Sequence, residues 1–179
     1  MNEIDLNGYV KTKGSANDDV LDGGVGTDVI IAGDGNDIVQ GFNGHDSLEG
    51  QDGDDRLYGQ AGWDYIDGGA DNDVIHGDSG VDTLYGGDGD DVLYGGDDSD
   101  EISGDAGNDE LVGGAGDDEL YGDAGVDEFI FEAGFGDDEI DSFEAGEKLN
   151  FASFSTVTYV SDLTITASGS ASLITLSGE

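Results

Sequence analysis

The sequence predicts an all-β fold, a parallel β-roll (a β-solenoid) closed by a C-terminal β cap. Three observations lead to this prediction. Aspartate recurs at every ninth position from Asp19 to Asp127. A large apolar residue follows each aspartate two positions later, and glycine or a close substitute stands two and five positions before it. A nine-residue repeat, G-G-x-G-x-D-x-U-x with U large and apolar, therefore fills residues 14–130.

Each repeat contributes one aspartate and one apolar residue. The aspartates are Asp19, Asp28, Asp37, Asp46, Asp55, Asp64, Asp73, Asp82, Asp91, Asp100, Asp109, Asp118 and Asp127. The apolar residues are Leu21, Ile30, Val39, Leu48, Leu57, Ile66, Ile75, Leu84, Leu93, Ile102, Leu111, Leu120 and Phe129. The first glycine is replaced once, by Ala32, and the later one only by Asn17, Asp71 and Asp98. Asn and Asp tolerate the left-handed backbone better than other side chains do.

The two halves of the repeat predict different elements. Its first six residues contain too many glycines for a helix and suit a turn. Its last three residues predict a short strand with U facing inward. One unit cannot bury its apolar residue alone, whereas stacked units with two strands per coil enclose a seam of U residues between two parallel sheets. Residues eighteen apart then lie above one another at ~4.8 Å spacing, in a column roughly 30 Å long.

The residue just before the aspartate supports a coil of two repeats, because its chemistry alternates between two rows. One row is rich in Asp and Asn: Asp18, Asn36, Asp54, Asn72, Asp90 and Asn108. The other row is mixed: Thr27, His45, Trp63, Val81, Ser99 and then Asp117. Two interpretations remain open. Either the Asx-rich row binds a metal more tightly, or its side chains only add hydrogen bonds that stabilise the turns.

The chemistry of the repeat predicts a calcium site. One apolar residue in nine makes a thin core, and stacked carboxylates repel one another on a chain of net charge −40. A hard cation that takes oxygen ligands would neutralise the carboxylates and add the stability that the thin core lacks. Carboxylates and carbonyls, with no thiolate and only two imidazoles, form a ligand set for Ca²⁺. Mg²⁺ is less suitable because it prefers strict octahedral geometry and keeps its waters.

These repeats resemble the RTX (repeat-in-toxin) family, and the resemblance covers about two thirds of the chain. It implies that Ca²⁺ lies between successive coils and that all thirteen repeat aspartates are metal ligands. One implied site combines the carbonyls of Gly33, Gly35, Gly50 and Asp52 with the carboxylates of Asp37 and Asp55. Seven repeats in one row and six in the other allow up to eleven sites between coils.

Composition limits the partners. Four basic residues against 44 acidic ones exclude nucleic acid and argue against anionic lipid and polyanionic sugars. We expect no disulfide, no cleavable signal peptide and no membrane span. RTX-like proteins leave bacteria through a type I exporter, so the resemblance implies a secreted, extracellular protein with calcium ions and a type I secretion apparatus as partners.

Three segments are expected: an N-terminal cap (1–13), the roll (14–130) and a C-terminal capping β region (131–179). The period slips by two residues after Phe131, and a degenerate repeat makes Asp138 a further ligand or loop aspartate. Short strands are predicted at 148–151, 157–160, 163–166 and 173–176. The segment 131–146 resembles the one that follows the roll in RTX proteases and lipases, which continue further, so we expect a truncated chain.

Catalysis by this chain is not expected, although it could be the tail of a secreted protease or lipase. Gly77–Gly80 spell the Gly-Asp-Ser-Gly string of trypsin-like proteases, but they stand in register as repeat residues. His-Glu-x-x-His and Gly-x-Ser-x-Gly are absent from the sequence. His45 and His76 occupy different repeat positions and share no catalytic partners.

Aromatic residues leave a second function open. Tyr58, His76 and Tyr94 stand eighteen residues apart on one outward face, and Tyr85 and Tyr121 share the other face with Ser103 between them. Such rows either pack across strands or grip a sugar. The predicted function is a calcium-binding RTX β-roll of a secreted bacterial protein, which folds on Ca²⁺ outside the cell and supports type I secretion. The alternative is an extracellular adhesin or glycan-binding module that uses calcium as a scaffold.

Overall fold

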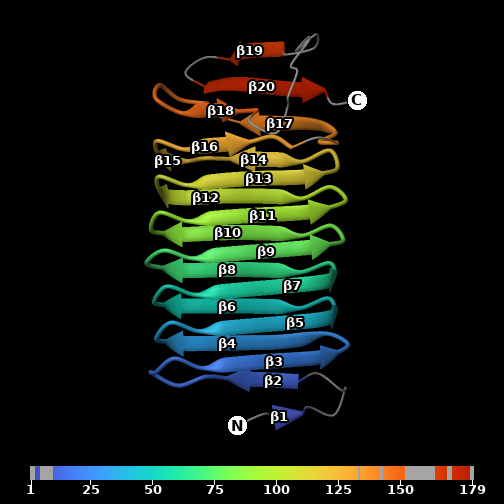
Figure 1. The fold of residues 1–179 in the computed structure, drawn as a ribbon, viewed down its shortest axis with the longest axis vertical. Helices are drawn as coiled ribbons and strands as arrows, with labels where there is room; N and C mark the ends of the chain where they lie inside the picture. Colours follow the sequence, from blue (N-terminus) through green and yellow to red (C-terminus); the bar gives the residue numbers. More distant parts are fainter. Residues whose placement is uncertain are drawn as a thin grey trace.

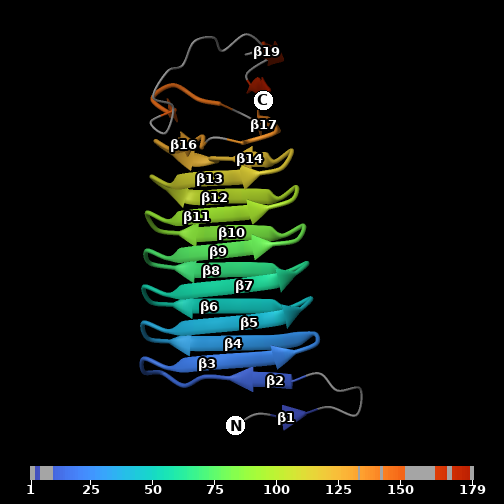
Figure 2. The same cartoon turned by 45° about the vertical axis from the view of Figure 1, so that its right-hand side comes forward.

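The protein is a column of stacked β coils. The computed structural model describes residues 3–4, 10–132, 134–141, 143–151, 164–168 and 171–177. Strands β3 to β13 alternate between two parallel sheets that face each other, so two repeats complete one coil (Figures 1 and 2). This arrangement confirms the predicted all-β roll. Within the described residues there is no helix, and hence none long and apolar enough to cross a membrane.

The first sheet has twelve strands in the order β1-β2-β4-β6-β8-β10-β12-β14-β17-β20-β19, with β15 beside β12. They are β1 (Glu3–Ile4), β2 (Val10–Lys13), β4 (Asp28–Asp34), β6 (Ser47–Asp52), β8 (Tyr65–Ala70), β10 (Thr83–Asp88), β12 (Glu101–Gly107), β14 (Glu119–Tyr121), β15 (Ala124–Gly125), β17 (Asp137–Asp141), β19 (Thr164–Ser168) and β20 (Ala171–Ser177). The second has eight strands in the order β18-β16-β13-β11-β9-β7-β5-β3. They are β3 (Val20–Val25), β5 (Ile38–Gly44), β7 (Arg56–Gly62), β9 (Val74–Ser79), β11 (Val92–Asp97), β13 (Glu110–Ala115), β16 (Glu128–Ile130) and β18 (Lys148–Asn150).

Neighbouring strands pair with an offset of eighteen residues. Leu48, Ile66 and Leu84, for example, lie opposite one another on β6, β8 and β10. At the end of the repeats the offset becomes twenty, because Leu120 pairs with Ile140 and Phe129 with Leu149. The two-residue slip read from the sequence is thus absorbed while the parallel pairing continues.

The strands are longer than predicted. Strands β3 to β13 contain six or seven residues each, instead of three. The ladder continues because residues assigned to the turn also find partners in the neighbouring coil, as Gln51 does with Gly69. Only about three residues, such as Gly53 to Asp55, remain between successive strands.

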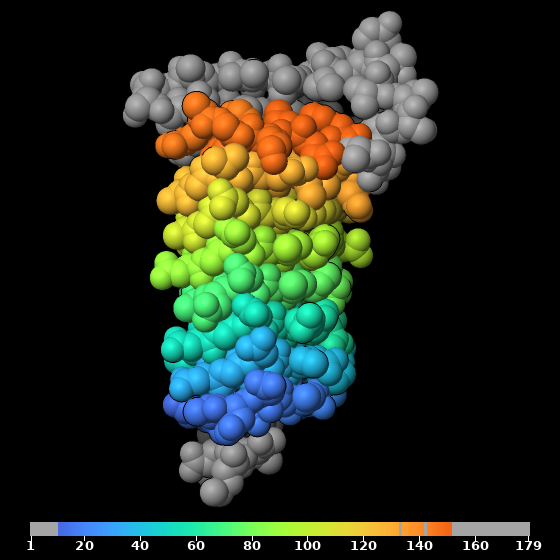
Figure 3. All heavy atoms as spheres, turned by 60° about the vertical axis from the view of Figure 1, so that its left-hand side comes forward, coloured from blue at the N-terminus to red at the C-terminus, as the bar shows by residue number. Residues whose placement is uncertain are grey.

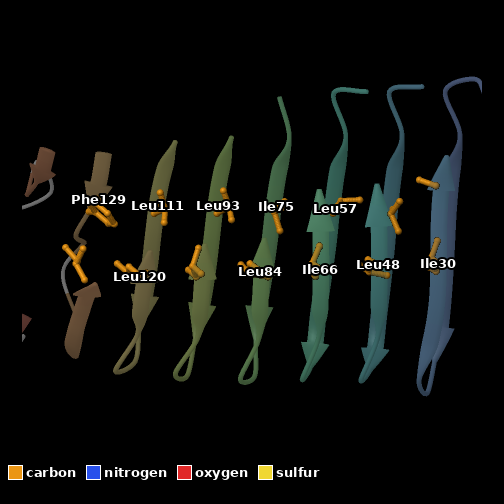
Figure 4. Close-up of a cluster of buried hydrophobic side chains, with 14 of the residues drawn as sticks. Ile30, Leu48, Leu57, Ile66, Ile75, Leu84, Leu93, Leu111, Leu120 and Phe129 are labelled. Atoms are coloured by element: carbon orange, nitrogen blue, oxygen red, sulfur yellow. The ribbon is translucent and has the colours of Figure 1, made fainter. Parts of the chain in front are cut away.

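The predicted apolar residues fill the space between the sheets (Figure 4). Each of them from Ile30 to Phe129 is 0 % exposed, whereas Leu21 on the first coil is only partly buried. Near the C-terminal end, the ring of Phe131 stacks on Phe151 at 5.1 Å. The surface of the column follows the coils in successive bands (Figure 3).

Antiparallel strands flank the first sheet at both ends. Strand β1 pairs antiparallel with β2, and β20 pairs antiparallel with β17 and β19. Strands β18, β19 and β20 coincide in part with three of the four strands predicted after residue 147. The strand predicted at 157–160 lies outside the described residues. The boundaries of cap, roll and C-terminal region stay a prediction.

Candidate metal centre

The repeat aspartates lie inside the roll. Each one stands in the turn just before a strand, except Asp28, which is the first residue of β4. They lie on the same inward face as the apolar residue two positions later. From Asp28 to Asp127 these residues are between 0 and 3 % exposed. Aspartate is almost never buried to this degree unless its charge is balanced. The roll therefore encloses two rows of acids beside its apolar seam.

One carboxylate oxygen, Oδ1, links each coil to the preceding one. The backbone N–H of Asp55 donates to Oδ1 of Asp73 (N···O 2.8 Å), and the N–H of Asp73 donates to Oδ1 of Asp91 (2.7 Å). The same bond recurs along both rows and reaches Asp138, whose Oδ1 accepts the N–H of Asp118 at 3.2 Å. These bonds fix the carboxylate and hold successive coils in register.

The second oxygen, Oδ2, makes no hydrogen bond within the described residues. This holds for Asp37, Asp46, Asp55, Asp64, Asp73, Asp82, Asp91, Asp100, Asp109, Asp118, Asp127 and Asp138. A buried acceptor without a donor is costly, and more so when it is charged. A further ligand is needed at each of these oxygens.

Oδ2 packs over a glycine of the facing sheet. A Cβ atom on Gly86 of β10 would lie 2.5 Å from Oδ2 of Asp91 and 2.7 Å from the carbonyl oxygen of Gly104. Gly77 has the same surroundings, at 2.5 Å from Oδ2 of Asp82 and 2.7 Å from a carbonyl oxygen of the next coil. Neither glycine has a positive φ angle. These glycines are needed for space, and carboxylate and carbonyl oxygens converge where a side chain would otherwise stand.

Burial raises the pKa of these carboxyl groups. It brings the pKa of Asp73 and Asp100 to about 8. The pKa reaches about 7 for Asp82, Asp109 and Asp138, and about 6 for Asp46, Asp55, Asp91 and Asp118. The pKa values of Asp37, Asp64 and Asp127 are raised too, for the same reason. Neighbouring carboxylates add to this for most of the row, whereas the backbone N–H bond lowers the pKa. The site therefore favours a cation or a proton.

The two ends of the rows differ. Asp19 is only partly buried, and its Oδ2 accepts hydrogen bonds from the backbone N–H and the hydroxyl of Ser15, at 2.7 and 2.8 Å. Asp138, which follows the two-residue slip, is 1 % exposed and has the same environment as the regular repeat aspartates. The degenerate repeat that precedes it was the signal for its place in the row.

The six residues named from the family resemblance lie on adjacent coils. The N–H of Asp37 donates to Oδ1 of Asp55 at 2.7 Å, and the N–H of Gly35 donates to the carbonyl of Asp52 at 2.8 Å. Among the described residues, no three His, Cys, Asp or Glu side chains gather as a metal site. Backbone carbonyls would have to supply most ligands, and this ligand set stays a prediction.

The Asx-rich row forms a hydrogen-bonded ladder between coils. The N–H of Asp90 donates to Oδ1 of Asn72 at 2.8 Å, and both the N–H and the side-chain amide of Asn108 donate to Oδ1 of Asp90. In the mixed row, His45 and Ser99 accept backbone N–H groups in the same way. These bonds support the interpretation of this position as a turn-stabilising one. Tighter metal binding by one row stays a prediction.

The aromatic row of the eight-stranded sheet packs as predicted from its spacing. His76 stacks between Tyr58 and Tyr94. On the other face Tyr85 instead contacts Tyr65, and the hydroxyl of Ser103 donates to Asp123 at 2.7 Å.

A comparison with protein families identifies the repeat. The model of the RTX calcium-binding nonapeptide repeat (4 copies) matches residues 13–39, 40–75, 76–111, 94–129 and 103–140. The chain belongs to this family. A search of curated proteins found no match for it. The RTX repeat is a calcium-binding module and not a catalytic one, and it accounts for the buried rows of carboxylates.

Proposed function

We propose that this RTX roll is a calcium-dependent folding module of a secreted bacterial protein. The observation that carries the proposal is the row of buried Oδ2 atoms from Asp37 to Asp138, which find no hydrogen-bond donor in the part of the chain that the structure describes. Ca²⁺ would supply the positive charge and the oxygen-seeking coordination sphere that these atoms lack. The repeat aspartates from Asp19 to Asp127 would hold the ions with carbonyl groups of the turns, at up to eleven positions between coils, and Asp138 would add one more after Asp118.

The same charges would make folding depend on calcium. Without calcium, the net charge of −40 and the thin core favour an expanded chain, which a type I exporter can thread. Extracellular calcium modules bind at ~0.1–1 mM, so the ion fills the turns only outside the cell. Because no site exists in the unfolded chain, the free energy of binding becomes free energy of folding.

A calcium titration from EDTA tests this proposal. Far-UV circular dichroism follows the β structure, and fluorescence follows Trp63, which is 66 % exposed and precedes Asp64. A cooperative transition from coil to β structure is expected with Ca²⁺, and not with the same concentration of Mg²⁺. A chain that is already folded in EDTA would contradict the folding switch.

A pair of variants locates the effect in the buried row. Asp100→Asn keeps an oxygen that can accept the N–H of Asp82 but removes the buried charge, so a higher calcium midpoint is expected. Asp88→Asn removes the same charge from an exposed side chain at the end of β10 and should leave the midpoint nearly unchanged. Equal shifts for both variants would mean that net charge, and not the buried site, controls folding.

A further inference from the structure

A ladder of rings crosses the outer face of the eight-stranded sheet and then stops. The rings of Tyr58, His76 and Tyr94 lie on neighbouring strands, with centroids 5.1 and 4.6 Å apart and planes within 10° and 7° of parallel. Both faces of His76 are covered by its neighbours. On the next strand, β13, Val112 lies in register with Tyr94. Among the described residues, no ring therefore lies beside the face of Tyr94 that is turned away from His76.

A hollow of about 460 Å³ opens at this point, across β9, β11 and β13. Tyr94, which is 37 % exposed, and Val112 border it. Much of its floor is bare backbone, because Gly96, Gly113 and Gly114 carry no side chain. The volume falls within the range of small-ligand sites.

The walls of the hollow favour a ligand that donates hydrogen bonds and carries no negative charge. Asp78, Asp97 and Glu132 line it, and no basic side chain does. The hydroxyl of Ser79 already donates to the carbonyl of Gln60 at 3.1 Å. Carboxylates accept strong, charge-assisted hydrogen bonds from hydroxyl groups but repel anions.

We infer that this hollow binds a neutral sugar ring. A pyranose has an apolar C–H face that can lie on the free face of Tyr94, in the place where the ladder lacks a ring. Its hydroxyl groups can donate to Asp97, Asp78 and Glu132. The site lies on the outer face of the sheet, whereas the repeat aspartates lie inside the roll. It thus adds a recognition function to the folded, calcium-loaded roll.

Titration of the calcium-loaded, folded chain with neutral tetrasaccharides of glucose, mannose and galactose tests this inference. Saturation-transfer NMR and calorimetry report binding. At least one neutral tetrasaccharide should bind, and a tetrasaccharide of uronic acids should not. No binding of any neutral sugar, or binding of an arginine-rich peptide alone, would overturn the inference. Circular dichroism of the same samples separates this outcome from failure of calcium-driven folding.

Three variants place the sugar on Tyr94. Tyr94→Ala should weaken binding about tenfold or more, since it removes the stacking surface. Val112 is only 6 % exposed, so the larger ring of Val112→Tyr should project into the hollow that Val112 borders and block binding; circular dichroism checks that this variant still folds. Tyr58→Ala removes a tyrosine from the other end of the same ladder, and affinity should stay within about twofold of the parent. If Tyr58→Ala weakens binding as much as Tyr94→Ala, or if Val112→Tyr leaves binding intact, the sugar does not lie in the hollow.

Discussion

At the scale of the residue, each buried repeat aspartate divides its carboxylate between two environments. In Asp91, Oδ1 accepts a backbone N–H from the preceding coil at 2.7 Å, whereas Oδ2 has no donor among the described residues and lies over Gly86 of the facing sheet. The first contact favours the charged form and the second disfavours it. Burial dominates and raises the pKa of Asp91 to about 6. At neutral pH the carboxylate is therefore charged and buried, and a cation beside it would stabilise it.

The raised pKa values predict how stability depends on pH. Between the unfolded value of 3.8 and about 8, the value for Asp73 and Asp100, the folded metal-free chain binds more protons than the unfolded chain. Its free energy of unfolding should therefore fall as pH rises through this interval. Circular dichroism in EDTA at several pH values measures it, because the metal-free chain should hold β structure only toward the acid end of this interval and lose it as pH rises to neutral. Saturating calcium should flatten the dependence, and a metal-free stability that increases with pH would contradict the prediction.

The facing glycine should be as sensitive as the aspartate. Gly86→Ala places a methyl group against Oδ2 of Asp91 and the carbonyl of Gly104, so a loss of ~1–3 kcal/mol in the calcium-bound state is expected. Gly24→Ala is the matched control, because a Cβ there has no atom within 4 Å and its φ is not positive. Chemical denaturation of both variants in saturating calcium measures their free energies of unfolding. A cost at Gly24 equal to that at Gly86 would show that glycine matters only for backbone freedom.

At the scale of the element, one ladder of side chains alternates charge with neutrality. Asp18, Asn36, Asp54, Asn72, Asp90 and Asn108 follow one another up the column. Asn36 and Asn72 each stand between two Asp residues of the ladder, and Asn108 stands between Asp90 and Val126. Amide groups of Asn36, Asn72 and Asn108 donate to the neighbouring Asp, so the ladder gains hydrogen bonds where it would have suffered repulsion.

Breaking the alternation should destabilise the roll. Asn108→Asp replaces a donor by a second carboxylate beside Asp90, and we expect a loss of ~0.5–1 kcal/mol at low ionic strength. The loss should shrink in high salt, because exposed charges are screened. Asn43→Asp is the control, since Asn43 lies exposed between Val25 and Ala61 in the adjacent coils. Thermal denaturation in saturating calcium measures both variants. A loss of stability that is equal at low and high salt would indicate that altered geometry, and not charge repulsion, destabilises the variant.

The elements also show what the sequence could predict. A period of nine identified the inward apolar residues and the aspartates, and the eighteen-residue alternation identified which residues stack. Strand length could not be read, because glycines such as Gly50 suit a turn locally but join the ladder once a neighbouring coil offers partners. The contact between Asp91 and Gly86 could not be predicted either, since it joins two sheets whose relative stagger the period leaves undetermined. The hollow beside Tyr94 arises because Gly96, Gly113 and Gly114 carry no side chain. The spacing of the repeat does not predict a hollow of this kind.

At the scale of the whole molecule, stability is a sum over neighbouring coils. The strands of each coil from β3 to β13 pair with those of the coils before and after, so no contact spans the length of the column. Charge is organised in the same way, in two interior rows that a bound cation can neutralise one coil at a time. We expect that calcium bound at one coil orders the site on the next coil, so calcium-driven folding should spread along the axis.

Deletions of different length test the coil as the structural unit. Removing residues 50–67 takes out eighteen residues, keeps every later strand in its own sheet and should preserve calcium-dependent folding, with the column shorter by ~4.8 Å. Removing residues 50–58 takes out nine and moves all later strands to the opposite sheet, so the Asp–Asn ladder is interrupted at the joint, where Asn36 meets Trp63 and His45 meets Asn72. Its calcium midpoint should be the higher of the two. Small-angle scattering and a calcium titration report length and midpoint, and equal midpoints would contradict the role of the ladder.

The direction of the strands has a mechanical consequence. They lie across the column, so the hydrogen bonds of both sheets run along its length (Figure 1). A pull on one end loads the bonds of a single coil and peels it away before the next one feels the force. Each coil that opens frees eighteen residues, about 60 Å of extended chain. The protein is thus compliant along its axis, and a motor that draws in one end meets a series of small barriers in place of a single large one.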